Sequence, residues 1–284
     1  MSPRQLKTAH EAYRDDIGSL VTRRPLPGPR LEQVSPFLFL NHHGPQTYPP
    51  NNGGLPFGPH PHRGFETVTF ILQGELAHHD TGGHESVIGE GGVQWMTAGS
   101  GLVHAEISPK SFLERGGPLE ILQLWVNLPS RLKFSAPNYV GLQRDDIPVV
   151  GVSEGVSAQL ISGELAGVRG PIESLTGVML SVVHLAAGAK ASLPAPAGRN
   201  VFFYVVSGEL RVGEAPVAKW RLAELTDGDS VEVEAVTEAR LLFGHAEPIE
   251  EPVFSHGPFV MTTREEIIAA IEDYNAGKFG SLTL

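Results

Sequence analysis

The two halves of this 284-residue chain contain the same short pattern, a strand-like stretch followed by a glycine turn and a second strand-like stretch. Residues 70–76 read FILQGEL and residues 204–210 read YVVSGEL, an offset of 134 residues. Farther along, Gly92 corresponds to Gly228 at an offset of 136 residues. A repeat of this length predicts that one fold was duplicated and that each half buries its own core.

Short strand-like stretches recur between glycine-rich turns, with no helix of comparable clarity between them. They lie at residues 67–72, 122–126, 178–183, 201–206 and 231–235. The 33 glycines and 23 prolines are too many for a helical bundle, whereas 41% hydrophobic residues is ordinary for a globular protein. This pattern favours an all-β sandwich or barrel over a parallel sheet with crossover helices.

A polar, proline-containing stretch between Pro129 and Pro148 is the predicted domain boundary. We therefore expect an N-terminal domain at residues 1–130 and a C-terminal domain at residues 131–284. One helix is predicted near the end of the chain, where Thr263 and Glu266 have the spacing of a capping box. The remaining helix signals are Ile267, Ile271 and Tyr274 on one face and Gly277 at the C-terminal end. This helix is expected to pack on a barrel rather than to bind a partner.

Charge and composition exclude several classes of function. There is no cysteine, so disulfides, thiolate metal sites and cysteine nucleophiles are excluded, and any metal must use nitrogen or oxygen ligands. The net charge of −11 repels phosphate, so we expect no direct binding to nucleic acid. No apolar run resembles a signal peptide or approaches membrane-spanning length. We expect a cytoplasmic protein whose partners are small molecules or proteins.

Two pairs of side chains in the first half have the spacing of a metal site. On a strand, residues two apart project to the same face, so His60 and His62 place two imidazoles side by side. His104 and Glu106 place an imidazole beside a carboxylate in the same way. If the pairs lie on facing strands, they can surround one first-row divalent ion and leave two octahedral positions open for water, substrate or dioxygen.

The second half lacks these candidate ligands. His60 and His62 correspond to Pro194 and Pro196, Glu66 to Asn200, His104 to Arg240 and Glu106 to Leu242. A purely structural role for the histidines would not predict this asymmetry. The first half is therefore the predicted metal-binding half.

Longer motifs resemble known families. The spacing of Gly54, His60, His62, Glu66 and Gly74 nearly reproduces the first motif of cupins, and GSGLVH at residues 99–104 resembles the second. The stretches GPHPHRGFETVTFILQGELAHHD, GGVQWMTAGSGLVHAE and EPVFSHGPFVMTTREEIIAAIEDYNAGKFG resemble signatures of the pirin family and follow its order. With LFLNHHGP near the start, the resemblance extends over nearly the whole chain.

The resemblance implies two tandem cupin (jelly-roll) barrels with a short C-terminal helix. It also implies one iron(II) per chain in the N-terminal barrel, bound by His60, His62, His104 and Glu106. Other divalent metals fit the same ligands. The C-terminal barrel is expected to hold no metal. Alternation along a strand would also place Glu66 beside His60 and His62, as in ordinary cupins. Spacing cannot choose between the two glutamates, and the pirin pattern favours Glu106.

Members of the pirin family are associated with two kinds of function. The first is quercetin 2,3-dioxygenase activity, in which a flavonol is opened by dioxygen; Glu106 would then be the catalytic base. The second is a non-enzymatic, iron-dependent, redox-sensing regulator acting on a protein partner. A zinc hydrolase is disfavoured because catalytic zinc usually has three protein ligands. The other histidines of the first half are expected to be solvated; they are His42, His43, His78, His79 and His84.

Overall fold

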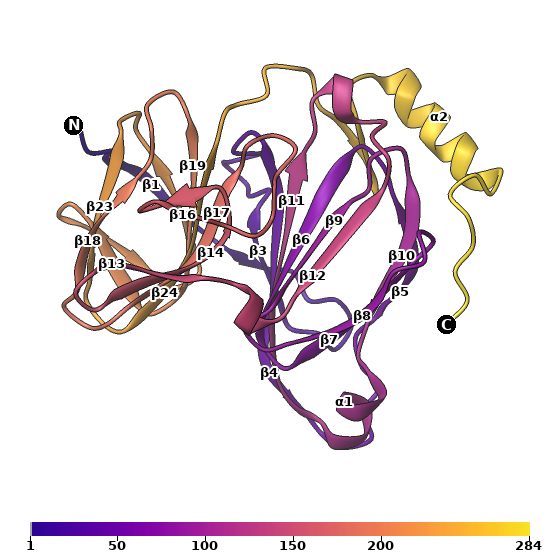
Figure 1. The fold of residues 1–284 in the computed structure, drawn as a ribbon, viewed down its shortest axis with the longest axis horizontal. Coiled ribbons are helices and arrows are strands. Elements are labelled where there is room, and N and C mark those ends of the chain that lie inside the picture. The colour runs from indigo at the N-terminus through magenta and orange to yellow at the C-terminus, as the bar shows by residue number, and fades with distance from the viewer. Residues whose placement is uncertain (1) are drawn as a thin grey trace. The chain divides into compact units, whose positions relative to one another are not determined.

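The computed structural model describes residues 2–284 and is built mainly of β-strands (Figure 1). Two α-helices occur among these residues, α1 (Lys110–Arg115) and α2 (Arg264–Asn275), together with two short 3-10 helices, η1 (Ser130–Leu132) and η2 (Arg144–Asp146). None of the described helices is long and apolar enough to cross a membrane. The expected all-β fold, two tandem cupin barrels with a short C-terminal helix, is confirmed.

The first barrel consists of a seven-stranded and a four-stranded sheet. The larger sheet has the order β12-β9-β6-β11-β4-β3-β2, and the smaller has the order β5-β10-β7-β8. Their bounds are β2 (Tyr13–Arg14), β3 (Thr22–Leu26), β4 (Phe37–Tyr48), β5 (Phe57–His62), β6 (Phe65–Gln73), β7 (Glu75–Asp80), β8 (Glu85–Gly89), β9 (Val93–Thr97), β10 (Leu102–Ile107), β11 (Gly117–Asn127) and β12 (Asn138–Leu142).

The second barrel is likewise built from a seven-stranded and a four-stranded sheet. Its sheets have the orders β1-β22-β19-β24-β17-β14-β13 and β18-β23-β20-β21. Their bounds are β1 (Leu6–Glu11), β13 (Val149–Ser153), β14 (Val156–Ser162), β17 (Met179–Leu185), β18 (Lys190–Pro194), β19 (Asn200–Ser207), β20 (Glu209–Val212), β21 (Ala215–Ala218), β22 (Arg221–Leu225), β23 (Ser230–Ala235) and β24 (Ala239–Ala246). Two small hairpins complete the fold, β15 (Glu164–Leu165) with β16 (Val168–Arg169), and β25 (Phe254–His256) with β26 (Phe259–Met261).

The strand orders of the two barrels correspond position by position, which supports the duplication predicted from the repeat. The repeated heptads form β6–β7 and β19–β20, and the glycine between the strands has a positive φ in both copies, 86° at Gly74 and 77° at Gly208. Other residues rarely adopt this conformation, so the turn itself explains why glycine occurs at both positions.

The compact units of the chain combine separate segments. One unit contains residues 1–13, 24–39 and 145–248, and the other contains residues 14–23, 40–144 and 249–284. The predicted domains, 1–130 and 131–284, are continuous pieces of chain, whereas each observed unit takes segments from both halves of the sequence. The N-terminal exchange arises because strand β1 pairs with β22 of the second barrel, as its indigo colour among orange strands shows in Figure 1.

Strand β6 forms the centre of the first barrel and is buried on both faces. Thr67, Thr69 and Ile71 alternate along one face and pair with Trp125, Gln123 and Ile121 of β11. Ile71 and Ile121 join a hydrophobic cluster that closes one end of this face, whereas Thr69 and Gln123 form a polar row beside it. This polar row faces β10 of the smaller sheet, because the Thr69 hydroxyl donates a hydrogen bond to Glu106 of that strand.

The core of the second barrel is apolar where the first barrel is polar. Strands β18 and β23 occupy the positions that β5 and β10 occupy in the first barrel. Their buried side chains, Ala191, Leu193, Val231 and Val233, belong to one large hydrophobic cluster. Burial of these side chains stabilises the second barrel without polar groups.

Helix α2 begins as its sequence predicts. The side chain of Thr263 accepts a hydrogen bond from the Glu266 N–H, and the Glu266 carboxylate accepts one from the Thr263 N–H. Ile267 is buried, and Gly277 follows the helix with a φ of 75°. The helix packs against β25 and β26, in the same compact unit as the first barrel.

Candidate metal centre

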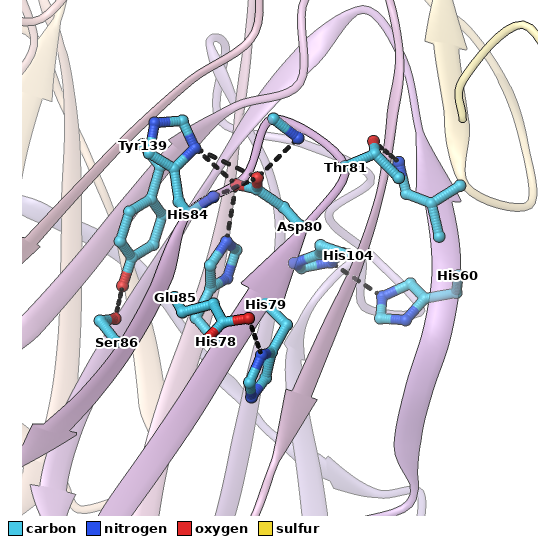
Figure 2. A network of polar contacts seen from close by, with 12 residues as sticks. His60, His78, His79, Asp80, Thr81, His84, Glu85, Ser86, His104 and Tyr139 are labelled. Atoms are coloured by element: carbon cyan, nitrogen blue, oxygen red, sulfur yellow. Dashed lines mark hydrogen bonds and ion pairs between the residues drawn. The ribbon is translucent and has the colours of Figure 1, made fainter. Parts of the chain in front are cut away.

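Three histidines of the first barrel converge on one point. His60 and His104 are direct partners on the adjacent antiparallel strands β5 and β10, and His62 lies two residues beyond His60 on the same face. Their potential ligand atoms all lie within 4.8 Å of one another. The Nε2 atoms of His60 and His104 are 3.0 Å apart, and a dashed line in Figure 2 marks this contact. The strands are neighbours in one sheet rather than on facing sheets.

Backbone carbonyls fix the tautomers of two of these rings. The Nδ1 of His60 lies 2.7 Å from the carbonyl oxygen of Gly58, and the Nδ1 of His62 lies 3.2 Å from that of Pro258. A carbonyl oxygen only accepts, so each Nδ1 must carry the proton. A proton on Nδ1 leaves Nε2 as the ring nitrogen that can bind a ligand, which is the arrangement typical of metal-binding histidines.

The distances and protonation states of the histidines fit a first-row metal ion. The Nε2 atoms of His60 and His104, 3.0 Å apart, are close enough for both to bind one ion at the usual metal–nitrogen distance of about 2.1 Å. Burial, together with the neighbouring histidines, lowers the pKa of His62 to about 3 and that of His104 well below its usual value. Both rings are therefore neutral at physiological pH, as ligation requires.

Glu106 lies on β10 two residues after His104, and its carboxylate points across the barrel interior to the other sheet. Its Oε1 accepts a hydrogen bond of 2.7 Å from the Thr69 hydroxyl, and its Oε2 accepts one from the Gln123 amide. Glu106 is buried but is not part of the group of atoms within 4.8 Å that the three histidines form. Each carboxylate oxygen has a second lone pair, so the anchored carboxylate can still accept another partner.

Glu66 projects from the opposite face of its strand. Phe65 and Thr69 lie on the interior face of β6, because the Phe65 ring is 5.0 Å from the ring of His62 and Thr69 bonds Glu106. Alternation therefore directs Glu66 away from the histidines. Its Oε1 accepts a hydrogen bond of 2.7 Å from Thr97, and burial raises its pKa.

The alternation argument that placed Glu66 beside His60 and His62 is therefore wrong. The turn at Arg63 and Gly64, where Gly64 has a φ of 89°, carries the chain from β5 in one sheet to β6 in the other. Counting in steps of two is valid only within one strand. The turn breaks that count between His62 and Glu66.

A second polar cluster adjoins the histidines and was not predicted from the sequence. His78 is buried on β7, and its Nε2 lies 2.9 Å from Asp80 Oδ2 (Figure 2). His84 contacts the same carboxylate at 3.1 Å, and the ring of Tyr139 stacks on His78 with centroids 4.0 Å apart. The His78 ring is 5.4 Å from that of His104. The His78-x-Asp80 spacing on a strand was the signal that could have revealed this cluster.

The expectation that the remaining histidines are solvated is wrong for three of the five. His42, His43 and His78 are buried. The Nε2 of His42 lies 2.9 Å from Glu120 Oε1, and the Nδ1 of His43 lies 2.8 Å from the Thr22 hydroxyl. Each buried ring has a polar partner, which compensates for the loss of hydration.

Comparisons with known proteins agree with the fold and with the sequence motifs. The family model for Pirin matches residues 19–126, and the model for the Pirin C-terminal cupin domain matches residues 180–280. A pirin-like protein of Caulobacter vibrioides is 43% identical over 267 residues, which are 93% of this chain and 94% of the relative. Human pirin is 38% identical over 275 residues, 94% of this chain and 90% of the relative.

A solved structure described as quercetin 2,3-dioxygenase from Acinetobacter baumannii is similar over the full length. It covers 99% of this chain and 100% of its own, with 34% sequence identity and a TM-score of 0.93. Both family models and these full-length relatives lead to the same conclusion. The chain belongs to the pirin family.

Proposed function

We propose that this protein is a metal-dependent dioxygenase that opens flavonols such as quercetin, with one iron(II) per chain held by His60, His62, His104 and Glu106. The observation that carries the proposal is the convergence of three imidazoles on one point in the first barrel, with the anchored carboxylate of Glu106 on the same strand as His104. The likeness to the Acinetobacter baumannii structure supports the choice of substrate class.

The bound metal would act as a Lewis acid that lowers the pKa of the flavonol 3-hydroxyl group, as it does for bound water. Glu106 would receive the proton from that hydroxyl group on one of its carboxylate oxygens. Thr69 and Gln123 donate to both oxygens and so hold the carboxylate in one orientation. A base that is already oriented does not have to be reorganised when the substrate binds.

Aromatic side chains pack beside the histidines and make this side of the proposed site apolar. The ring of Trp125 lies 5.4 Å from that of His62 and 4.4 Å from that of Phe65, measured between centroids. Phe65 is fully buried and Trp125 is nearly so, which makes this wall apolar. Such a wall favours an aromatic substrate and excludes water from the reacting groups.

Oxygen uptake tests the proposal. Protein purified without oxygen and loaded with iron(II) should consume one dioxygen per quercetin and release carbon monoxide together with a depside. The rate should rise with pH as the 3-hydroxyl group or its base deprotonates, and chelators should inhibit. A flavone that lacks the 3-hydroxyl group is the matched control and should not react. If loaded protein leaves quercetin intact, or opens both compounds equally well, the dioxygenase proposal fails.

A second candidate function is a non-enzymatic, iron-dependent regulator that binds a protein partner. The observation in its favour is an apolar groove of about 420 Å³ on β25 and α2. Phe254 and Ile268 in this groove are 44% and 50% exposed. Loaded protein that is inactive on flavonols but changes its affinity for a partner with the redox state of the iron would favour this function.

A further inference from the structure

The C-terminal segment contacts the first barrel at the residues that directly follow the candidate ligands. The carbonyl oxygen of Pro258, in the turn between β25 and β26, accepts the hydrogen bond from His62 Nδ1. Two residues later, the Val260 N–H donates to the carbonyl oxygen of Arg63 at 3.1 Å. A segment almost 200 positions away in sequence thus sets the orientation of one histidine ring.

A buried lysine ties the same two pieces of chain together. The Lys133 ammonium donates to the carbonyl oxygens of Gly64 and Val260, at 2.9 and 3.0 Å, and to Asn127 Oδ1 at 2.8 Å. Lys133 is 1% exposed. A Cβ on Gly64 would lie 2.0 Å from the Val260 carbonyl oxygen, so the two backbones approach as closely as glycine permits.

Arg63 provides the third tie. Its Nη1 donates to Asp273 of α2 at 2.9 Å, and its Nε donates to the carbonyl oxygen of Ser100 at 2.7 Å. The guanidinium also lies 4.5 Å from the centre of the Phe279 ring. Arg63 follows His62 directly, so α2 and the chain after it are anchored beside the candidate ligand.

We propose that the C-terminal segment, residues 254–284, is a positioning element of the metal centre, which holds the Pro258 carbonyl against His62 and so presents the His62 Nε2 to the ion. The inference rests on the proposed metal centre. Because coupling between two binding equilibria is reciprocal, metal binding and docking of this segment stabilise each other by the same factor. Partners of a ligating histidine typically change metal affinity about 10- to 100-fold when they are lost.

Variants on α2 test the first half of this coupling. Asp273→Asn removes the charge that pairs with Arg63 and Lys278 without altering a barrel side chain, and Glu272→Gln is its matched control because Glu272 is an exposed carboxylate on the same helix. Lys133→Met is the second variant, since it leaves the Gly64 and Val260 oxygens without their donor. Affinity is measured for cobalt(II) alone, by competition with a chelator. We expect about fivefold or greater weakening in Asp273→Asn and Lys133→Met, and no change in Glu272→Gln.

Proteolysis of the unaltered chain tests the reciprocal half. Arg264 and Lys278 are exposed trypsin sites within the segment. Cobalt(II) should slow cleavage at both sites by about fivefold or more. A chain that binds no cobalt would overturn the proposed metal centre itself. Tight binding with wild-type affinity in both variants, and with no protection from trypsin, would overturn the positioning role and leave the centre intact.

Discussion

Backbone carbonyls, rather than other side chains, determine which ring nitrogen of His60 and His62 carries the proton. Gly58 and Pro258 accept from the Nδ1 atoms of His60 and His62, so neither ring can rotate without losing a hydrogen bond. The His104 Nδ1 is buried and has no hydrogen-bond partner within residues 2–284. A polar contact can therefore fix the orientation of His104 only through its Nε2. Of the three rings, His104 should be the most sensitive to loss of the ligand at Nε2.

Alanine at single histidines should separate ligands from bystanders. His62→Ala and His104→Ala should each remove most of the bound iron, because each deletes one of the three converging nitrogens. His84→Ala is the control, since His84 binds the carboxylate of Asp80 and lies outside the group. Iron per chain is measured after purification without oxygen. Equal losses in all three variants would mean that the ligands are misidentified.

Glutamine at the two glutamates should have unequal effects. Glu106→Gln replaces an acceptor oxygen with an amide donor facing the donors of Thr69 and Gln123, and should weaken iron binding by roughly tenfold or more. Glu66→Gln should leave iron binding nearly unchanged, because burial raises the pKa of Glu66 and its side chain faces Thr97. Chelator competition and the spectrum of the bound metal give the readouts. The reverse result would move the site to the ordinary cupin arrangement.

His245 of β24 should make the unit that contains the second barrel sensitive to acid. Burial, together with Arg199 and Arg4, lowers the pKa of His245 from 6.5 to about 4. The unfolded chain therefore binds more protons between pH 6.5 and pH 4, so stability rises with pH across that window and is lost as the pH falls. At pH 5 the loss from this group is roughly 1–2 kcal/mol.

Urea unfolding of wild type and His245→Gln at pH 7.5 and pH 5 measures that contribution. Glutamine does not titrate, and its oxygen can accept the hydrogen bond that Arg199 Nε donates to His245 Nδ1 at 2.8 Å. The variant should therefore lose less stability on acidification than the wild type. An identical loss in both proteins would show that His245 does not titrate in this window.

At the scale of strands and helices, patterns within one element were readable from the sequence. Four of the five predicted strands are contained in β6, β11, β19 and β23, the fifth begins one residue before β17, and the capping box starts α2. These signals are local, because alternation and capping depend on residues a few positions apart. The pairing of His60 with His62 on one face of β5 follows from the same rule.

Relations between elements were not readable in the same way. Alternation reports which residues share a face, but not which sheet a strand joins, so the change of sheet at Gly64 and the place of Glu66 were missed. The burial of His78 depends on Tyr139 of β12, about 60 residues away. The Pro258 carbonyl has no side-chain signature at all. Contacts between distant segments leave no periodic trace in either segment.

At the scale of the whole chain, duplication separates two roles that a single barrel would have to combine. The seven-stranded and four-stranded sheets recur in both halves, so the fold of the first barrel does not depend on its polar interior. The second barrel fills the corresponding strands with Ala191, Leu193, Val231 and Val233. The polar residues of the first barrel are therefore retained for a reason other than folding, since an apolar core is sufficient to stabilise this architecture.

The stoichiometry of tightly bound metal tests this division of roles. The chain should hold one tight metal ion, because strands β18 and β23 direct apolar side chains into the core where β5 and β10 direct histidines. Metal content is measured against protein concentration after dialysis, and a titration with cobalt(II) should show one tight equivalent. His104→Ala should reduce that equivalent to near zero, since within residues 2–284 no second group of three or more histidines and carboxylates has all its ligand atoms within 4.8 Å of one another. Two tight equivalents would contradict the division of roles, because neither the apolar core of the second barrel nor its sequence supplies another set of ligands.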